Sequence, residues 1–204
     1  MWSVGPLDGT KEFIKQNGEF TVNIALIHNS KPVIGITVVP VIDVIYLGWV
    51  GIGAYKIKIQ NGLENSIKHN DLENILTHSD KLSPAKINNS VTIVISRSPP
   101  DGLTNKLVQL LSEEGIVANI INRGSALKFG LVAAGTADIY ARSNNSYEWD
   151  TASGDALINA AGGRIVSVLD GKSLEYNKQH LKNSGFITIS SEYLWKRIRS
   201  KFSF

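Results

Sequence analysis

The sequence predicts an α/β protein whose first part is an antiparallel sheet, in the manner of an α+β fold, and whose second part alternates strands with helices. Two observations carry this prediction. Runs rich in β-branched residues follow one another with brief turns up to residue 59, which is typical of an antiparallel meander. After residue 90, short apolar strands alternate with stretches of helical spacing, which is typical of βαβ units. We therefore expect two regions, residues 1–89 and 90–204.

The first region begins with a short strand at residues 2–4 that leads into a turn at residues 5–10. Glycine and proline favour a turn there, because glycine permits positive φ angles and proline fixes φ. Four more strands are expected where β-branched residues gather, at residues 20–28, 32–39, 43–49 and 53–59. Residues 61–89 are rich in Asn, Lys and Ser, which predicts a linker or an irregular crossing.

The second region contains strands and helices of ordinary length. Apolar residues recur with helical spacing at residues 103–114, and a glycine follows this stretch and each of the next two predicted helices. The expected strands lie at residues 91–95, 117–121, 137–141, 164–169 and 186–190. The expected helices lie at residues 103–114, 125–134, 151–161 and 192–202.

Composition excludes several classes of protein. Of 204 residues, 43% are hydrophobic and 19% are charged, which is ordinary for a globular protein with a sizeable core. The absence of cysteine excludes a disulfide framework, a thiolate zinc site and a thiol nucleophile, and suits the cytoplasm. A net charge of +3 and a single small basic cluster near the C-terminus give no nucleic-acid interface. No apolar run reaches the ~20 residues of a membrane span.

The first candidate site is Asp8-Gly9-Thr10, directly after the opening strand. Gly9 lets the backbone approach an anion, Thr10 adds a hydroxyl, and successive N–H groups in such a turn form an anion-binding nest. Asp8 is a hard oxygen donor of the kind that Mg²⁺ prefers. The same residues also make an ordinary surface turn, so the spacing alone leaves both interpretations open.

Two further candidates lie at predicted helix starts. Asp150 is expected directly before the helix at residues 151–161, where the helix dipole keeps a carboxylate ionised. It suits a metal ligand or a plain N-cap. Gly124 and Ser125 open the helix at residues 125–134, with Lys128 one turn in, which suits a phosphate pocket or a capped helix with a solvated lysine.

Taken together, these motifs resemble one family. The opening GPLDGT at residues 5–10 is similar to the Asp-Pro-Leu-Asp-Gly-Thr motif of the inositol monophosphatase superfamily, and other blocks are similar to its CysQ-type 3'(2'),5'-bisphosphate nucleotidase branch. Those blocks are KEF at 11–13, NGEFTVNIAL at 17–26, ISRS at 95–98, GSALK at 124–128 and WDTASGDA at 149–156. They occur in the family's order and span nearly the whole chain.

The resemblance implies a fold, an activity and a set of roles. It implies a layered αβαβα sandwich and Mg²⁺-dependent hydrolysis of 3'-phosphoadenosine 5'-phosphate, a small phosphorylated nucleotide, to AMP and phosphate. By position, Asp8, the Leu7 carbonyl and Asp150 match metal ligands. The N–H groups of Gly9 and Thr10 match phosphate donors, and the Thr10 hydroxyl matches the group that orients the attacking water. The segment with Gly124, Ser125 and Lys128 matches a part of the nucleotide pocket.

Two departures from the family pattern bear on activity. The motif's first aspartate is Gly5 here, which offers no side-chain oxygen. The family also takes ligands and its water-activating acid from a Gly-x-Glu-Glu-like segment, and this chain begins after the place for it. We therefore expect the sandwich without its N-terminal helices and with one sheet face exposed. We also expect weak or no activity, since general-base help is worth about 10²–10⁴-fold.

Alternatives stay open at this stage. The chain is also compatible with half of a split enzyme completed by a separately encoded N-terminal fragment, with a homodimer, and with a protein that binds nucleotide or phosphate without turnover. Inositol monophosphatase activity is a further alternative. The resemblance predicts a cytoplasmic protein, with the inner face of the cell membrane as an alternative location.

Overall fold

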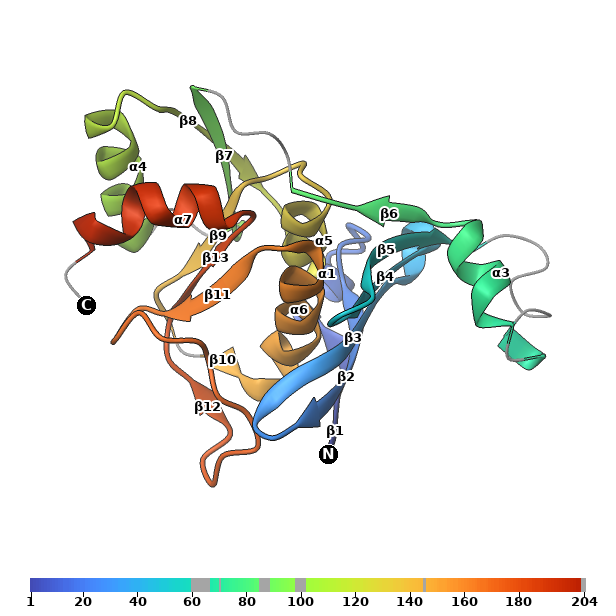
Figure 1. Ribbon diagram of the computed structural model, residues 1–204. Coiled ribbons are helices and arrows are strands. Elements are labelled where there is room, and N and C mark those ends of the chain that lie inside the picture. Colours follow the sequence, from blue (N-terminus) through green and yellow to red (C-terminus); the bar gives the residue numbers. More distant parts are fainter. Residues whose placement is uncertain (60–66, 70, 85–88, 98–101, 145, 203–204) are drawn as a thin grey trace.

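The computed structural model describes residues 1–59, 67–69, 71–84, 89–97, 102–144 and 146–202 (Figure 1). The first part of the chain forms a six-stranded antiparallel sheet in which each strand pairs with its neighbour in sequence. Short turns dictate this order, because a tight turn returns the chain to the adjacent antiparallel position. The strands are β1 (Trp2–Asp8), β2 (Thr21–His28), β3 (Lys31–Val39), β4 (Val44–Trp49), β5 (Gly53–Lys58) and β6 (Asp80–Leu82).

The second part of the chain forms a five-stranded mixed sheet in the order β11-β13-β9-β7-β8. Strand β7 pairs in parallel with β8 and β9, whereas β13 pairs antiparallel with β9 and β11. Parallel neighbours need a crossover, and helices α4 (Gly102–Glu113) and α5 (Leu127–Ala133) supply it. The strands are β7 (Ser90–Ile95), β8 (Val117–Asn122), β9 (Ile139–Arg142), β11 (Arg164–Ser167) and β13 (Phe186–Ile189).

The elements stack in layers. Helices α5 and α6 (Glu148–Ala161) lie between the two sheets, and α4 and α7 (Glu192–Ile198) lie on the far side of the five-stranded sheet (Figure 1). One buried apolar cluster fills the space between the sheets, and a second lies under α4 and α7. The predicted α/β sandwich is therefore confirmed. The first cluster draws on residues from both predicted regions, and the boundary at residue 89 stays a prediction.

Helix α6 approaches the six-stranded sheet closely because glycines leave room for it. A Cβ atom added to Gly48 on β4 would lie 2.2 Å from the Cα of Leu157, and one added to Gly35 on β3 would lie 2.1 Å from the Ser153 carbonyl oxygen. Only residues without a Cβ allow the two backbones to meet at this distance. This contact fixes the position of α6, which carries Asp150 at its N-terminal end.

The structure corrects two predictions in the first region. Strand β1 does not end at residue 4 but runs to Asp8, because its pairing with β2 resumes after an irregularity between Gly5 and Asp8. Proline is tolerated there because β1 is an edge strand of the described sheet. Residues 61–89 are not only a linker, since they contain helix α3 (Leu72–Thr77) and strand β6. Residues 61–66, 70 and 85–88 lie outside the described residues.

Further differences concern helix ends and short elements. Helix α6 begins at Glu148, three residues before the predicted start, and places Asp150 inside its first turn. Helix α7 ends at Ile198 and continues as a 3₁₀ turn, η2 (Arg199–Lys201). No periodic pattern marks the shortest elements, which are α1 (Thr10–Ile14), η1 (Pro40–Ile42), β10 (Ser146–Tyr147) and β12 (Lys182–Asn183). Among the described residues, no helix is long and apolar enough to cross a bilayer.

Candidate active site

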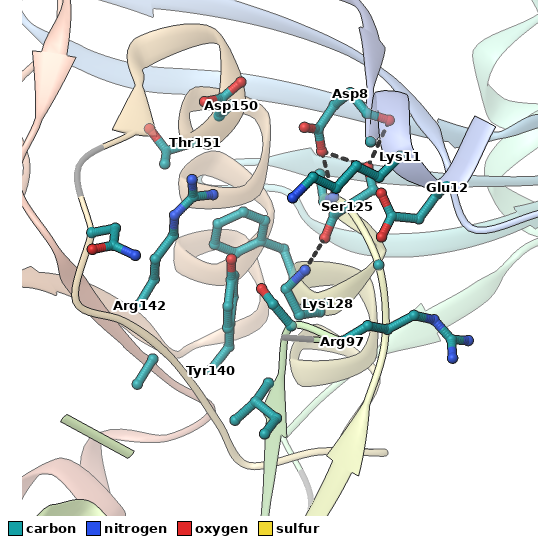
Figure 2. Close-up of a pocket in the computed structure, with 18 of the residues that line it drawn as sticks. Asp8, Lys11, Glu12, Arg97, Ser125, Lys128, Tyr140, Arg142, Asp150 and Thr151 are labelled. Atoms are coloured by element: carbon teal, nitrogen blue, oxygen red, sulfur yellow. Dashed lines mark hydrogen bonds between the residues drawn. The ribbon is translucent and has the colours of Figure 1, made fainter. Parts of the chain in front are cut away.

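A cavity of about 500 Å³ opens where β1, α1, α5 and the N-terminal end of α6 meet (Figure 2). Its wall includes five cationic side chains and three carboxylates, together with apolar and aromatic groups. The charged residues are Lys11, Lys15, Arg97, Lys128, Arg142, Asp8, Glu12 and Asp150. Segments more than 100 residues apart in the sequence therefore build one polar cavity, of a size that suits a small-molecule ligand.

Asp8 ends β1 and is held by the loop that precedes α5. One of its carboxylate oxygens accepts hydrogen bonds from the Ser125 hydroxyl at 2.5 Å and from the Ala126 backbone N–H at 2.7 Å (Figure 2). The chain passes from β1 into α1 at Gly9, whose φ of 85° lies in the left-handed region that favours glycine. Strand β1 and the two hydrogen bonds thus fix the direction of this carboxylate.

Ser125 links three elements at the cavity wall. Besides Asp8, its hydroxyl oxygen lies 2.7 Å from that of Thr21 on β2, and its own carbonyl accepts a hydrogen bond from the Lys128 ammonium at 2.6 Å. The segment from Gly124 to Lys128 therefore touches the metal-ligand candidate on one side and presents a cation on the other. The sequence predicted that this segment shapes the pocket, and the structure places all three of its candidate residues in the cavity wall.

Lys128 is a buried cation, only 3% exposed. Its ammonium lies 4.9 Å from the centre of the Tyr140 ring. Burial lowers the pKa of Lys128 to about 8, against the opposing effect of the nearby Asp8 charge. Burial also raises the pKa of Tyr140 to about 12, so this phenol keeps its proton. An anionic ligand in the cavity would favour the charged form of Lys128.

Asp150 lies at the third position of α6, not before the helix as predicted. Its carboxylate accepts a hydrogen bond from the Tyr147 backbone N–H at 3.0 Å, so it forms part of a capping box. Burial raises the pKa of Asp150 above its ordinary value, and the Asp8 charge adds to this effect. The capping interpretation and the cavity-lining interpretation therefore both hold for this residue.

The remaining predicted residues do not all line the cavity. Gly9 lines the cavity, whereas the exposed side chains of Leu7 and Thr10 do not contribute to its wall. Gly5 lies on β1 opposite Asn23 of β2, and a Cβ added to Gly5 would lie 3.1 Å from the Trp149 carbonyl oxygen. Beside it, Asn23 is 1% exposed, and its amide nitrogen and oxygen have no hydrogen-bond partner among the residues that the structure describes.

Several residues in the cavity wall or bonded to it were given no role by the sequence analysis. Glu19 accepts hydrogen bonds from Arg97 at 2.6 and 2.9 Å and from the Gly124 backbone N–H at 2.6 Å, so it ties two loops of the wall together. The Arg97 and Gly124 contacts lower the pKa of Glu19, against the effect of burial. Its position in the block at residues 17–26 was the only available signal. Lys11 and Glu12 lie in the KEF block and Thr151 lies in the WDTASGDA block, but none of them was given a role; Lys15, Tyr140, Arg142 and Asn144 lie in no quoted block.

The carboxylates of the cavity are the side chains that could hold a metal ion. Asp8 and Asp150 interact electrostatically, and Figure 2 shows both at one end of the cavity. Among the described residues, no group of three His, Cys, Asp or Glu side chains is arranged to hold an ion. Asp8 and Asp150 are hard oxygen donors, which could hold one cation together with oxygens from water and from a ligand.

Comparison with known proteins gives the family. A family model described as "Inositol monophosphatase family" matches residues 1–200. The chain belongs to the inositol monophosphatase family. Among the similar proteins is the 3'(2'),5'-bisphosphate nucleotidase CysQ of Salmonella typhimurium, 40% identical over 186 residues that cover 91% of this chain and 66% of that protein. The Buchnera aphidicola protein with the same name is 38% identical over 188 residues, covering 91% and 62%.

Solved structures of related proteins share the fold of this chain. CysQ from Bacteroides thetaiotaomicron has a TM-score of 0.79 and 38% identity, and the match covers 94% of this chain and 70% of that one. An inositol monophosphatase from Anabaena has a TM-score of 0.69 at 20% identity, covering 98% and 70%, and shows the shared fold alone. This chain spans about two thirds of the length of the curated relatives that it matches.

Proposed function

We propose that this family member is a Mg²⁺-dependent 3'(2'),5'-bisphosphate nucleotidase that converts 3'-phosphoadenosine 5'-phosphate to AMP and phosphate in the cytoplasm. Its similarity to proteins named CysQ supports the substrate class. The observation that carries the proposal is the cavity itself, where five cations outnumber three carboxylates. A bisphosphate needs carboxylates and a metal at the phosphate that is cleaved, and cations at the phosphate that is kept.

Asp8 and Asp150 would hold the ion. When bound, such an ion neutralises phosphate charge and lowers the pKa of a bound water. Hydrogen bonds from the Ser125 hydroxyl and the Ala126 N–H hold the Asp8 carboxylate in its orientation. The backbone carbonyl of Leu7 is a third proposed ligand. The N–H groups of Gly9 and Thr10 would bind the phosphate that leaves, and the Thr10 hydroxyl would orient the attacking water.

The phosphate that is kept would lie on the side of the cavity away from Asp8 and Asp150. Lys128 and Arg142 are the cations proposed to bind it, since Figure 2 shows both side chains within the cavity, whereas the Arg97 guanidinium points away from them and pairs with Glu19. In the reaction the water oxygen forms a bond to phosphorus, the bond from phosphorus to the 3'-oxygen breaks, and the 3'-oxygen takes up a proton. Only two side-chain carboxylates are proposed as ligands, and Gly5 offers none, so we expect slow turnover.

Phosphate release from 3'-phosphoadenosine 5'-phosphate tests the proposal, with and without Mg²⁺. Asp150→Asn is the sharpest variant, because its amide oxygen still accepts the Tyr147 N–H and preserves the cap while the charged ligand is lost. We expect at least a 100-fold fall in kcat, with unchanged unfolding. Lys172→Gln, at a side chain 82% exposed, is the matched control. Equal rates in the Asp150 variant and the parent would contradict the proposed role.

Nucleotide binding without turnover is the second candidate. It is favoured by the absence, among the described residues, of a three-ligand metal group. Calorimetry with 3'-phosphoadenosine 5'-phosphate distinguishes the two, since a binder gives heat without phosphate release. Lys128→Gln should weaken binding of the bisphosphate more than that of AMP, because it removes a cation assigned to the second phosphate. Inositol 1-phosphate serves as the competing substrate and should be hydrolysed more slowly.

A further inference from the structure

The side chain of Glu19 joins three segments of the chain at the cavity wall. Glu19 lies between α1 and β2, and its carboxylate accepts two hydrogen bonds from Arg97, which follows β7. It also accepts one from the backbone N–H of Gly124, in the loop before α5, at 2.6 Å. The Arg97 guanidinium meets the carboxylate as a planar fork, and bidentate pairs of this kind fix the orientation of both groups. The Glu19 side chain is 13% exposed, so water competes little for these bonds.

The backbone around Glu19 is itself held in place. Its N–H donates a hydrogen bond to the Asn17 side chain at 3.0 Å. The preceding residue, Gly18, has a φ of 78°, which favours glycine. The next residue, Phe20, packs edge-on against Phe13 of α1, with the ring centres 5.1 Å apart. Glu19 is therefore a fixed point from which a carboxylate reaches the loop before α5.

The loop that Glu19 contacts contains a left-handed residue. Ser125 has a φ of 53°, in a region that residues with a side chain adopt only where surrounding contacts hold them there. Before it, the Gly124 N–H donates to Glu19. After it, the Ala126 N–H donates to Asp8 at 2.7 Å. Gly124 has no side chain to restrict its backbone, so the Glu19 carboxylate supplies the restraint on that side of the turn.

The conformation of Ser125 decides the orientation of two charged groups. Its hydroxyl donates to the Asp8 carboxylate at 2.5 Å, and its carbonyl accepts from the Lys128 ammonium at 2.6 Å (Figure 2). A rotation of the Ser125 backbone would move the hydroxyl and the carbonyl together, so both charged groups would lose a partner. The contacts therefore run from Glu19 through the Gly124 backbone to Ser125, and from there to Asp8.

We propose that Glu19 is a positioning residue, which holds the turn before α5 so that Asp8 keeps its orientation toward a bound cation. The catalytic part of this proposal rests on the proposed function, because there Asp8 is a metal ligand. The described residues that line the cavity do not include Glu19, so it acts through its neighbours and not on a ligand. An exposed ion pair with Arg97 alone would contribute little, whereas the bond to the Gly124 N–H reaches the turn directly.

Hydrogen exchange of backbone amides, measured by NMR on the full chain, tests the positioning role without any ligand. Glu19→Ala should speed exchange of the Gly124 amide about tenfold or more, and that of the Ala126 amide, which bonds to Asp8 and not to Glu19, about fivefold or more. Glu19→Gln retains an oxygen for the Gly124 N–H and should keep both rates within about threefold of the parent. The amide of Val94, in the core strand β7, should exchange as in the parent, which separates a local change from a general loss of stability.

Phosphate release measures the catalytic consequence. In Glu19→Ala the Mg²⁺ concentration that gives half of the maximal rate should rise about fivefold or more, because Asp8 is less well oriented, and Glu19→Gln should restore the parent value. Glu192→Ala is the matched control, since it removes a comparable pair with Arg164, at hydrogen-bond distance of 2.8 Å, on another part of the surface. This control should leave both the exchange rates and the Mg²⁺ requirement unchanged.

The outcomes distinguish the positioning role from the proposed function. Unchanged exchange at Ala126 in Glu19→Ala overturns the positioning role, as does equal acceleration in Glu19→Gln. Faster exchange with an unchanged Mg²⁺ requirement overturns the link to the cation. Faster exchange in a chain that releases no phosphate supports the positioning role and contradicts the proposed function alone. If Glu19→Ala does not fold, Glu19→Asp, which withdraws the carboxylate by one methylene group, provides the same comparison with Glu19→Gln.

Discussion

Asp155 provides the strongest quantitative prediction, because it is a carboxyl group inside the core. It lies on α6, 3% exposed, and accepts hydrogen bonds from the Tyr176 hydroxyl at 2.8 Å and from the Asn159 amide at 2.5 Å. Burial raises its pKa to about 7, against the effect of these hydrogen bonds. The change Asp155→Asn keeps the size of the side chain and an oxygen for Tyr176, and removes the charge.

The magnitude follows from the two pKa values. The folded protein keeps the Asp155 proton up to a pH of about 7, whereas the unfolded chain loses it near 3.9. Between these values the folded state binds more protons, so the free energy of unfolding falls as the pH rises. The total loss is about 4 kcal/mol at 1.36 kcal/mol per pKa unit, of which about 3 kcal/mol falls between pH 5 and 8.

Urea unfolding of the parent and of Asp155→Asn, across pH 5 to 8, measures this effect. The variant should become more stable relative to the parent as the pH rises, by about 3 kcal/mol over the range. Asp80→Asn, at an exposed position on β6, is the control and should follow the parent. A constant difference between parent and Asp155→Asn would refute the reasoning, as would a difference that shrinks with pH.

Three other changes test the packing that positions the site. Gly48→Ala places a Cβ 2.2 Å from the Cα of Leu157 and should lower the free energy of unfolding by about 3 kcal/mol, measured in urea. Ser125→Ala removes the hydroxyl that holds Asp8 and should cost about 1.5–3 kcal/mol; an unchanged midpoint would argue against this bond. Asn23→Leu removes two unpartnered amide atoms and should raise the melting temperature, whereas a lower one would indicate a hidden partner.

Much of the fold followed from local patterns. The runs that became β2 to β5 are rich in β-branched residues and end at turn residues, and each formed within two residues of its predicted position at either end. Asn29 and Ser30 adopt the positive φ angles of a tight hairpin turn, as the short connection required. Strand β6 escaped prediction because its three residues, Asp80–Leu82, carry no periodic pattern and gain their order from pairing with β5.

The residues of the candidate site also differ in whether local sequence patterns could predict them. Asp8, Asp150 and the segment from Gly124 were found from the sequence because their motifs are contiguous. Arg142 and Glu19 were not, because each reaches the site through contacts with residues distant in the chain. The start of α6 was placed too late, since its first turn is stabilised by a capping box that involves Tyr147 rather than a conventional cap residue.

By itself, the sequence determined the two kinds of sheet and the family resemblance, and it pointed to two carboxylates, Asp8 and Asp150, that line the cavity. These are local properties, because propensity, periodicity and motif spacing are written in neighbouring residues. Only the tertiary structure decided which side chains face the same cavity and that Lys128 is buried beside Tyr140. Those features depend on layers that meet across more than 100 residues, where burial and charge are set by the packing of one layer on another.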